Sequence, residues 1–263
     1  MQEMKVSVLG SGSSGNSIYL SYRGTSILID AGMSGREINR RLQKCDSTIE
    51  ELDAVFITHE HNDHITGAGV ISRRCDIPIF ANKLTWEALD GEIGSIKPDN
   101  KKLISGSLSM GPFFLSSFSI SHDARDPIGY VVRTEGGSVG IGTDMGYVNS
   151  EVKHQLKDLD FLIIESNHDY EMLMQGSYPP HLKRRIKSKQ GHLSNDAAAE
   201  ILPDLMEKKL PRILLAHLSR DNNMPDLAYI TIKNRLEAAG LKVGSDLDIE
   251  FTYHDRPTKL FCV

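Results

Sequence analysis

The sequence of 263 residues contains little cysteine, which excludes a disulfide framework and a zinc site built of thiolates. Its three cysteines, Cys45, Cys75 and Cys262, are odd in number and show no Cys-x-x-Cys spacing. A disulfide framework or a zinc site built of thiolates would need paired or clustered cysteines. The cysteine content is therefore typical of a reducing compartment, and we expect a cytoplasmic protein.

Long apolar runs are also missing. No stretch approaches the roughly 20 apolar residues that a membrane-spanning helix needs. The first residues show neither the apolar stretch nor the cleavage site of a signal peptide. We therefore expect no contact with a membrane.

The sequence has no excess of positive charge. Thirty Lys and Arg residues against 35 Asp and Glu residues make a formal net charge of -5. This balance excludes a DNA-coating protein, so any contact with nucleic acid must come from a local basic patch. Hydrophobic residues make up 40% and charged residues 25%, as in globular proteins. No Pro/Gly-rich linker divides the chain, and we expect one domain over residues 1–263.

Short apolar runs alternate with amphipathic stretches along the chain. The predicted strands are 6–9, 18–20, 26–29, 54–58, 77–81, 113–119, 130–133, 139–142, 161–165, 213–217 and 249–253. The predicted helices are 34–42, 84–89, 150–156, 195–206 and 227–239. Because strands and helices occur together in both halves, we expect an α/β (α+β) fold of four layers, in which two sheets pack face to face between helices.

Ionisable residues directly follow or end several predicted strands. They are Asp30, His59, Asp144, Glu165 and His217. A rigid sheet can present such residues to a cleft, so all five could line one site.

Residues 59–64 read HEHNDH and indicate a metal site. Imidazole and carboxylate groups are preferred ligands of zinc, manganese and iron. In extended backbone His59 and His61 point to the same side and can bind one ion, while Asp63 and His64, beyond a turn, can reach a second. A solvated His-rich loop is the alternative, but the apolar strand directly before the motif favours metal binding.

The motif and the residues that follow it resemble the metallo-β-lactamase superfamily. The further matching segments are SISHD with His122, GTDMG with Asp144 and LAHLS with His217. The resemblance implies an αββα sandwich and two divalent metal ions (Zn, Mn or Fe). The implied ligands are His59, His61 and His122 for one ion, Asp63, His64 and His217 for the other, and Asp144 as the bridge.

Other segments are similar to the WalJ (YycJ) group of this superfamily. They are GSGSSGN at 10–16, ESNHD at 165–169 and GHLSN at 191–195. This group is regarded as acting on DNA, so the resemblance implies a DNA exonuclease. Other branches fit less well, because no cysteine lies near the later motifs, and Asp144 and His217 are too close for the β-CASP insertion. Diiron oxidoreductases would have Glu at the position of His61.

These residues suggest a mechanism in which a hydroxide bridging two ions attacks a phosphodiester. We expect Asp63 to bind metal and orient that hydroxide, and Asp30 to accept a hydrogen bond from a metal-bound histidine. A turn or cap role is the alternative for Asp30. His192 is the candidate general acid because the ordinary pKa of histidine suits proton transfer at neutral pH. A structural histidine beside a helix is the alternative.

Residues 183–189 contain five cations and no acid. We expect Lys183, Arg184 and Arg185 to bind the phosphates of a substrate, and a solvated helix face is the alternative. The further candidates for substrate contact are Ser14, Asn16 and His168.

Three other functions remain open from the residues alone. An RNA-processing or small-molecule phosphodiesterase would use the same chemistry as a nuclease that acts on DNA. A mononuclear-iron oxygenase acting on sulfur compounds would bind one iron and have no need of His192. A noncatalytic metal-binding module is the last alternative. No feature of the sequence predicts an oligomeric state.

Overall fold

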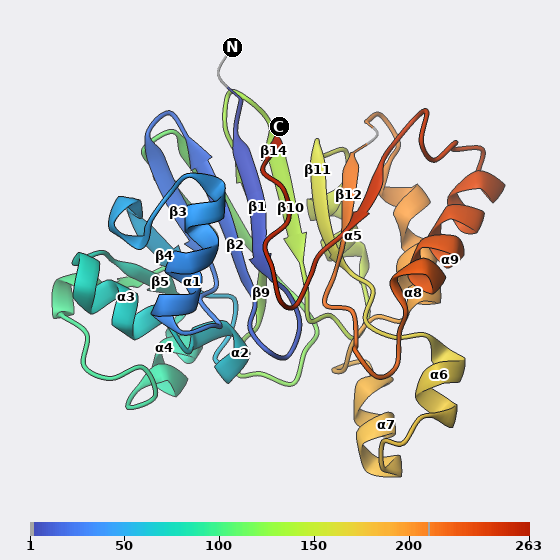
Figure 1. Cartoon of the computed structure of the whole chain (residues 1–263), viewed down its shortest axis with the longest axis horizontal. Coiled ribbons are helices and arrows are strands. Elements are labelled where there is room, and N and C mark those ends of the chain that lie inside the picture. The colour runs from blue at the N-terminus through green and yellow to red at the C-terminus, as the bar shows by residue number, and fades with distance from the viewer. Residues whose placement is uncertain (1–2, 210) are drawn as a thin grey trace.

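The computed structural model describes residues 3–209 and 211–263, and two mixed sheets lie face to face at its centre (Figure 1). The first sheet contains β1 (Lys5–Gly10), β2 (Ser17–Tyr22), β3 (Thr25–Ile29), β4 (Ala54–Phe56), β5 (Ile79–Ala81), β6 (Lys101–Leu103) and β14 (Phe261–Cys262). The second contains β7 (Ser107–Met110), β8 (Phe113–Ser119), β9 (Ile128–Arg133), β10 (Ser138–Gly142), β11 (Phe161–Glu165), β12 (Arg212–Ala216) and β13 (Ile249–Phe251).

Within each sheet the strands follow chain order, except that β14 pairs with β1 at the edge of the first sheet. The strands from β3 to β6 are parallel, and so are those from β10 to β13. The carboxyl ends of parallel neighbours meet at one edge of a sheet, which is where α/β proteins place their sites.

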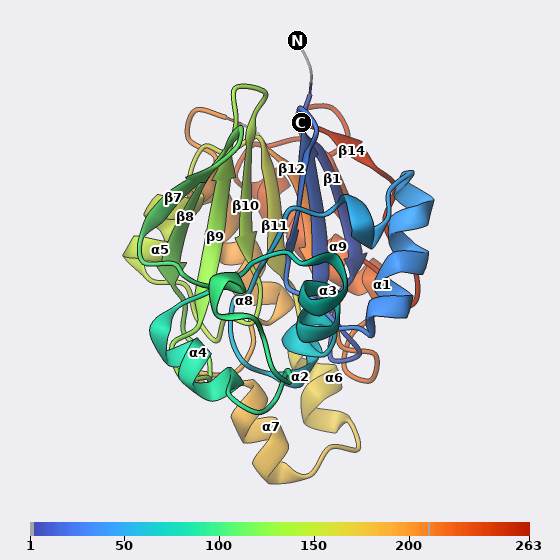
Figure 2. The same cartoon turned by 90° about the vertical axis from the view of Figure 1, so that its left-hand side faces the viewer.

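Helices cover the outer face of both sheets (Figure 2). The first sheet is covered by α1 (Gly35–Leu42), α3 (Ala68–Cys75) and α4 (Lys83–Leu89). The second is covered by α5 (Ser150–Leu156), α8 (Asn195–Ile201) and α9 (Pro225–Ala238). The remaining helices are α2 (Asn62–Ile65), α6 (Tyr170–Gln175) and α7 (Pro180–Ile186), and the short 3-10 turns span 43–45, 49–51, 98–100 and 202–205. The predicted four-layer αββα fold is confirmed.

The core between the sheets is apolar, and hydrogen bonds near the site join β9 to the segment behind β4. Val6, Leu20, Val132 and Ile163 are among its fully buried side chains. Burial of such side chains stabilises a fold by roughly 1.5–3 kcal/mol each. The buried hydroxyl of Tyr130 in β9 donates to the carbonyl oxygen of Ile57 at 2.9 Å, which ties the second sheet to the segment behind β4.

Some element boundaries differ from the predicted ones. The predicted helix 195–206 ends as an α-helix at Ile201 and continues as a 3-10 turn, because Pro203 has no N–H and its ring clashes with the preceding turn. The predicted strand 54–58 ends at Phe56, where the chain leaves the sheet toward the histidine motif. The predictions omitted β6, β7, β14, α2, α3, α6 and α7. Within the described residues, no helix is long and apolar enough to cross a membrane.

Candidate metal centre and active site

The predicted metal ligands lie behind the carboxyl ends of strands from both sheets. His59 and His61 follow β4, and His64 lies in α2, whose first residue comes directly after His61. The second sheet supplies His122, Asp144 and His217, which follow β8, β10 and β12. The cleft between the ends of the two sheets therefore gathers residues that are far apart in the sequence.

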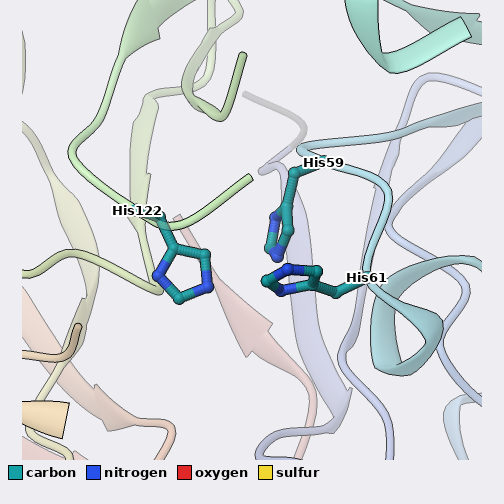
Figure 3. A group of neighbouring side chains, drawn as sticks. All are labelled: His59, His61 and His122. Carbon is teal, nitrogen blue, oxygen red and sulfur yellow. The ribbon is translucent and has the colours of Figure 1, made fainter. Parts of the chain in front are cut away.

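Three histidines form one cluster of donors (Figure 3). Each of His59, His61 and His122 offers a ring nitrogen, and these nitrogen atoms lie within 4.8 Å of one another. Burial lowers the pKa of His59 well below its ordinary value, and His64 lowers it further. A neutral imidazole is the form that binds a metal ion, so this environment suits a ligand.

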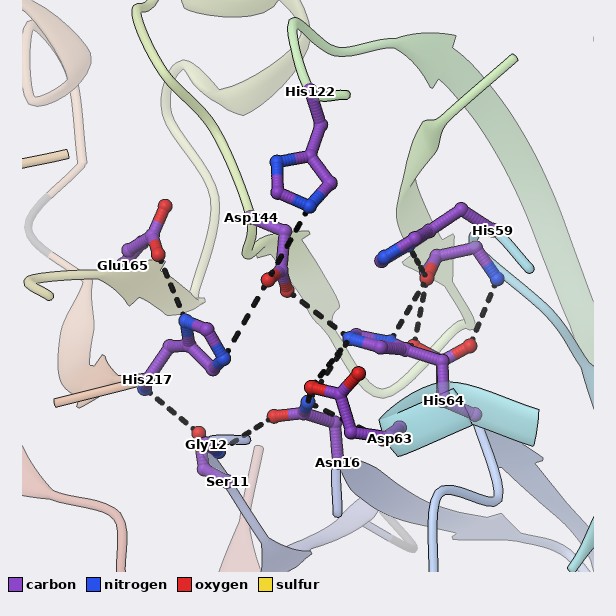
Figure 4. Close-up of polar contacts among 12 residues, drawn as sticks. Ser11, Gly12, Asn16, His59, Asp63, His64, His122, Asp144, Glu165 and His217 are labelled. Carbon is purple, nitrogen blue, oxygen red and sulfur yellow. Dashed lines mark hydrogen bonds and ion pairs between the residues drawn. The ribbon is translucent and has the colours of Figure 1, made fainter. Parts of the chain in front are cut away.

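Asp144 lies at the centre of the other donors (Figure 4). Its Oδ2 atom is 3.4 Å from Nε2 of His64, and its Oδ1 atom is 3.5 Å from Nε2 of His217. The same Oδ1 atom is 4.0 Å from Nε2 of His122. Asp144 thus faces ligands from both sheets, as a bridging carboxylate would.

Several of these buried atoms have no hydrogen-bond partner within the described part of the chain. They are Nε2 of His59, Nε2 of His217 and Oδ2 of Asp144. An unpaired buried polar atom costs about 1–3 kcal/mol, so native structures rarely leave three of them at one place. A divalent cation would satisfy all three, and the nitrogen and oxygen donors fit zinc, manganese or iron.

Three site residues have backbone conformations that are uncommon for residues other than glycine. Asp30, Asp144 and His217 have φ values of 62°, 58° and 58°. Each follows a strand, and the left-handed conformation turns the chain sharply there. Such strain is concentrated at functional sites, where the surrounding structure maintains it.

Asp30 fixes His64 from the side opposite Asp144. Its Oδ2 atom accepts a hydrogen bond from Nδ1 of His64 at 2.8 Å. The backbone N–H and the hydroxyl of Thr58 also donate to Asp30, each at 2.8 Å. With Nδ1 occupied in this way, Nε2 of His64 faces Asp144 and the centre of the site.

Glu165, at the end of β11, forms hydrogen bonds with two histidines. The sequence predicted no specific role for it. Its Oε1 atom accepts hydrogen bonds from Nδ1 of His192 at 2.7 Å and from Nδ1 of His217 at 2.9 Å. Its Oε2 atom accepts from the backbone N–H of Met145 at 2.6 Å. The signals in the sequence were its place at the end of an apolar strand and the segment ESNHD at 165–169, and neither indicated its partners.

The carboxylates make the centre of the site electrostatically negative. Burial alone would lower the pKa of His217, but Asp144 and Glu165 outweigh it and raise that pKa to about 9. Burial would likewise lower the pKa of His64, which Asp30 and Asp144 instead raise well above its ordinary value. Such a potential favours a cation at the centre.

Asn16 joins the glycine-rich turn to the histidine motif. Its amide nitrogen lies 3.2 Å from Oδ2 of Asp63 and 2.9 Å from Nε2 of His64, while its Oδ1 atom accepts from the N–H of Gly12 at 2.7 Å. A Cβ atom at Gly32 would collide with the backbone oxygen of Asp63, so this close approach requires glycine. Asp63 itself lies outside the groups of possible metal donors found in the described residues, and its Oδ2 atom is 3.7 Å from Nε2 of His64. These groups are His59, His61 and His122; His59, His64 and Asp144; and Asp144, Glu165, His192 and His217.

A family model described as a β-lactamase superfamily domain matches residues 25–217. The chain belongs to the metallo-β-lactamase superfamily. It is 40% identical over 256 residues to the exodeoxyribonuclease YycJ of Bacillus anthracis, with 97% of each chain covered. It is 39% identical over 260 residues to the exodeoxyribonuclease WalJ of Streptococcus pneumoniae, again with 97% of each chain covered. The predicted membership of the WalJ (YycJ) group is thereby confirmed, as is the prediction of a hydrolytic enzyme.

Solved structures of other proteins share the fold. The metallo-β-lactamase fold protein YhfI of Bacillus subtilis superposes with a TM-score of 0.72 at 18% identity, covering 98% of this chain and 99% of its own. Yeast PDE1 superposes with a TM-score of 0.71 at 15% identity, covering 99% and 100%. These likenesses support the αββα architecture.

Two cavities open beside the histidines of this metallo-β-lactamase fold. The larger, of about 560 Å³, has among its lining residues Ser13, Ser14, Asn62, Asp63, Arg220 and His254. The smaller, of about 230 Å³, has among its lining residues Gly12, Tyr178, Arg185, His192, His217 and Arg220. His192 is 16% exposed, and its ring centre lies 5.1 Å from that of His122. His192 therefore lies among the possible donors around Asp144 and also lines the smaller cavity.

Of the predicted substrate contacts Ser14, Asn16 and His168, one lines a cavity and two do not. Ser14 lines the larger cavity, and its hydroxyl accepts a hydrogen bond from Arg220 at 3.3 Å. Asn16 and His168 are buried, at 6% and 2% exposure, and line neither cavity. Asn16 instead contacts Asp63 and His64, and the backbone of His168 pairs with Ser194.

The three cations of the basic run have different surroundings in α7. The ammonium of Lys183 donates to the carbonyl oxygens of Met174 and Gly176, each at 2.7 Å, which anchors α7 to the end of α6. Arg185 lines the smaller cavity and pairs with Asp123 at 2.5 Å. Arg184 is exposed to solvent.

Proposed function

We propose that the protein is a metal-dependent phosphodiesterase that acts on nucleic acid, and specifically a DNA exonuclease. The observation that carries the proposal is the convergence of the donors around Asp144, with His192 held beside them by Glu165. The two relatives of similar length are named exodeoxyribonucleases. A DNA substrate also accords with the cytoplasmic location that the cysteine content predicts.

The donor set supports two divalent ions. His59, His61 and His122 would hold the first ion, and Asp144 would bridge it to the second. The second ion would take His64, His217 and Asp63 as its other ligands. When bound, such ions polarise a phosphoryl oxygen and lower the pKa of water to near neutrality.

Two residues have further roles in the proposed reaction. Asp63 is 23% exposed at the larger cavity, and the amide of Asn16 donates to its Oδ2 atom, so the carboxylate would be held in place to orient an attacking water. His192 donates through Nδ1 to Glu165, so its Nε2 atom remains to protonate the leaving oxygen.

This role of His192 distinguishes the proposal from the oxygenase alternative. An iron oxygenase acting on a sulfur compound releases no alkoxide and needs no proton donor at that place. The proposal therefore predicts that loss of His192 slows hydrolysis most for substrates with a poor leaving group. We expect an activated nitrophenyl diester, whose leaving group needs no proton, to be hydrolysed almost normally by His192→Ala.

The test combines metal content with nucleotide release from linear duplex DNA, RNA and a nitrophenyl diester. We expect two ions per chain, loss of digestion in His61→Ala, and a loss of about 10²–10⁴-fold in DNA hydrolysis by His192→Ala, which retains its metal. The control His154→Ala alters an exposed residue of α5 and should behave like the native chain. One iron per chain with no hydrolysis of any substrate would refute the proposal, and a strong preference for RNA would move the substrate to RNA.

A further inference from the structure

The smaller cavity combines an aromatic ring, an apolar wall and two arginines next to the candidate general acid. Tyr178, Leu182 and Ile186 line it from the α6–α7 segment, which projects from the body of the molecule (Figure 1). His192 and His217, which belong to the candidate metal centre and its surroundings, also line it. A volume of about 230 Å³ lies below the roughly 300–1,000 Å³ typical of ligand pockets, so the cavity suits one small unit of a polymer.

Tyr178 is anchored in this wall at both ends. Its backbone precedes two prolines, Pro179 and Pro180, which restrict the chain at the start of α7. Its hydroxyl donates to Oδ2 of Asp221 at 2.7 Å, and Asp221 lies in the loop behind His217. The ring is therefore held before any ligand arrives, which lowers the entropy cost of binding.

The loop behind His217 and the α6–α7 segment are packed closely enough to keep this geometry. The N–H of Asp169, directly before α6, donates to the carbonyl oxygen of Asn222 at 2.9 Å. A Cβ atom at Gly176 would lie 2.6 Å from Oδ1 of Asn222, so the two segments approach within van der Waals distance. Contacts between the α6–α7 segment and the loop behind His217 therefore hold the cavity wall in place.

The charges around the cavity suit a phosphate at its mouth. Arg220 lines both cavities, and its only side-chain hydrogen bond within residues 3–209 and 211–263 is to the hydroxyl of Ser14, at 3.3 Å. Most of its five N–H donors are thus available to a phosphate oxygen. Among the described residues that line the smaller cavity, Asp221 is the one acid, and its carboxylate accepts a hydrogen bond from the hydroxyl of Tyr178.

We propose that the smaller cavity is a nucleoside subsite that receives the leaving side of the scissile bond, with the ring of Tyr178 stacking on the base and Arg220 contacting the backbone at the boundary between the two cavities. The inference rests on the proposed function, because it places the leaving oxygen at His192. Aromatic stacking accepts any base, so the subsite recognises that a base is present and not which base it is.

The test uses the metal-loaded full chain and deoxydinucleotides that lack the base on the leaving nucleoside, on the other nucleoside, or on neither. The products identify which nucleoside leaves. In the native chain we expect loss of the leaving base to slow hydrolysis by about tenfold or more, and loss of the other base to have a smaller effect. Tyr178→Ala should hydrolyse the intact dinucleotide more slowly than the native chain does, by a similar factor. Removal of the leaving base should not slow hydrolysis by this variant any further. Tyr178→Phe, which keeps the ring, should remain sensitive to that base.

The matched control is Tyr170→Ala, which removes an exposed ring of α6 that lines neither cavity and should leave the base effect as in the native chain. A binding measurement with deoxyadenosine monophosphate and with deoxyribose 5-phosphate separates this proposal from the proposed function. If the native chain hydrolyses DNA but Tyr178→Ala keeps the full base effect, the subsite is refuted and the nuclease stands. If the chain hydrolyses neither DNA nor RNA but binds deoxyadenosine monophosphate through Tyr178, the nuclease is refuted, and the role of the cavity as a leaving-side subsite is refuted with it, while nucleotide binding there stands.

Discussion

Glu165 is completely buried, yet it is ionised and accepts hydrogen bonds from two imidazoles and two backbone N–H groups. Burial alone would raise its pKa, but His192 and His217 outweigh that effect and hold the pKa at about 2. One carboxylate thus orients both the proposed proton donor and a proposed metal ligand. Hydrogen bonds of this kind fix which ring nitrogen faces the metal or substrate.

We predict that Glu165→Gln lowers DNA hydrolysis about 10–100-fold and weakens metal binding, because an amide has only one acceptor oxygen where the carboxylate has two. The NH₂ group of the introduced amide would face one of the N–H groups that now donate to Glu165, and that buried N–H group would then have no acceptor. Turnover and a metal titration of the folded variant would measure both effects. Glu151→Gln, at an exposed position of α5, is the control. Native turnover in Glu165→Gln would contradict the positioning role.

At the scale of single elements, one buried arginine of α1 forms hydrogen bonds with two segments that are distant in the sequence. Nη1 of Arg41 donates to the carbonyl oxygen of Leu9 at 2.7 Å and to that of His254 at 3.1 Å. Glu37, one turn earlier, accepts from Nε of Arg41 at 2.6 Å. The side chain of Ser34 caps the helix by accepting from the N–H of Glu37. The helix therefore joins β1 to the segment before β14.

This arrangement predicts a pH dependence of stability. Hydrogen bonds from Arg40 and Arg41 lower the pKa of Glu37 from 4.5 to about 2. A lowered pKa means that the contribution is complete above pH 4.5 and is lost as the pH falls from 4.5 toward 2. Because Glu37 is partly exposed, we expect about 1–2 kcal/mol at neutral pH after solvent screening.

Urea unfolding of Glu37→Gln and the native chain at several pH values would measure this contribution. The difference in unfolding free energy should be greatest at neutral pH and shrink below pH 4.5. Glu87→Gln, at an exposed position of α4, serves as the control and should show no such trend. A difference that stays constant down to acid pH would contradict the assignment to Glu37.

Over the whole molecule, the candidate metal centre connects the two sheets. Its donors from the first sheet follow β4, and those from the second follow β8, β10 and β12. An ion bound only by the folded chain stabilises it by about 4 kcal/mol at a thousandfold excess over its dissociation constant. Metal loss should therefore weaken the packing of the sheets as well as abolish activity.

We predict that chelation lowers the melting temperature by about 8–16 °C, since 1 kcal/mol corresponds to roughly 2–4 °C in a chain of this size. Scanning calorimetry before and after chelation, followed by addition of Mn²⁺ or Zn²⁺, would measure the loss and its recovery. His154→Ala should retain the full shift, while His61→Ala should show a smaller one. An unchanged melting temperature in the chelated native chain would contradict a metal ion between the sheets.

The αββα layers and the histidine motif could be predicted because they depend on patterns of nearby residues. Apolar periodicity marks strands and helices, and HEHNDH concentrates metal donors within six positions. The role of Glu165 could not be predicted in this way, since its partners lie 27 and 52 positions away. The end of α8 was misplaced because helical periodicity outweighed Pro203 in the prediction.

The sequence by itself determined the superfamily, the layered architecture and the chemical types of the donors, because each of these depends on local composition and motif order. Only the tertiary structure decided which groups meet. It sets Asp144 between ligands of both sheets, engages Lys183 with the end of α6, and anchors Tyr178 to the loop behind His217. Hydrogen bonds and cavities join segments that are distant in the chain, so their geometry depends on how the two sheets and their loops pack together.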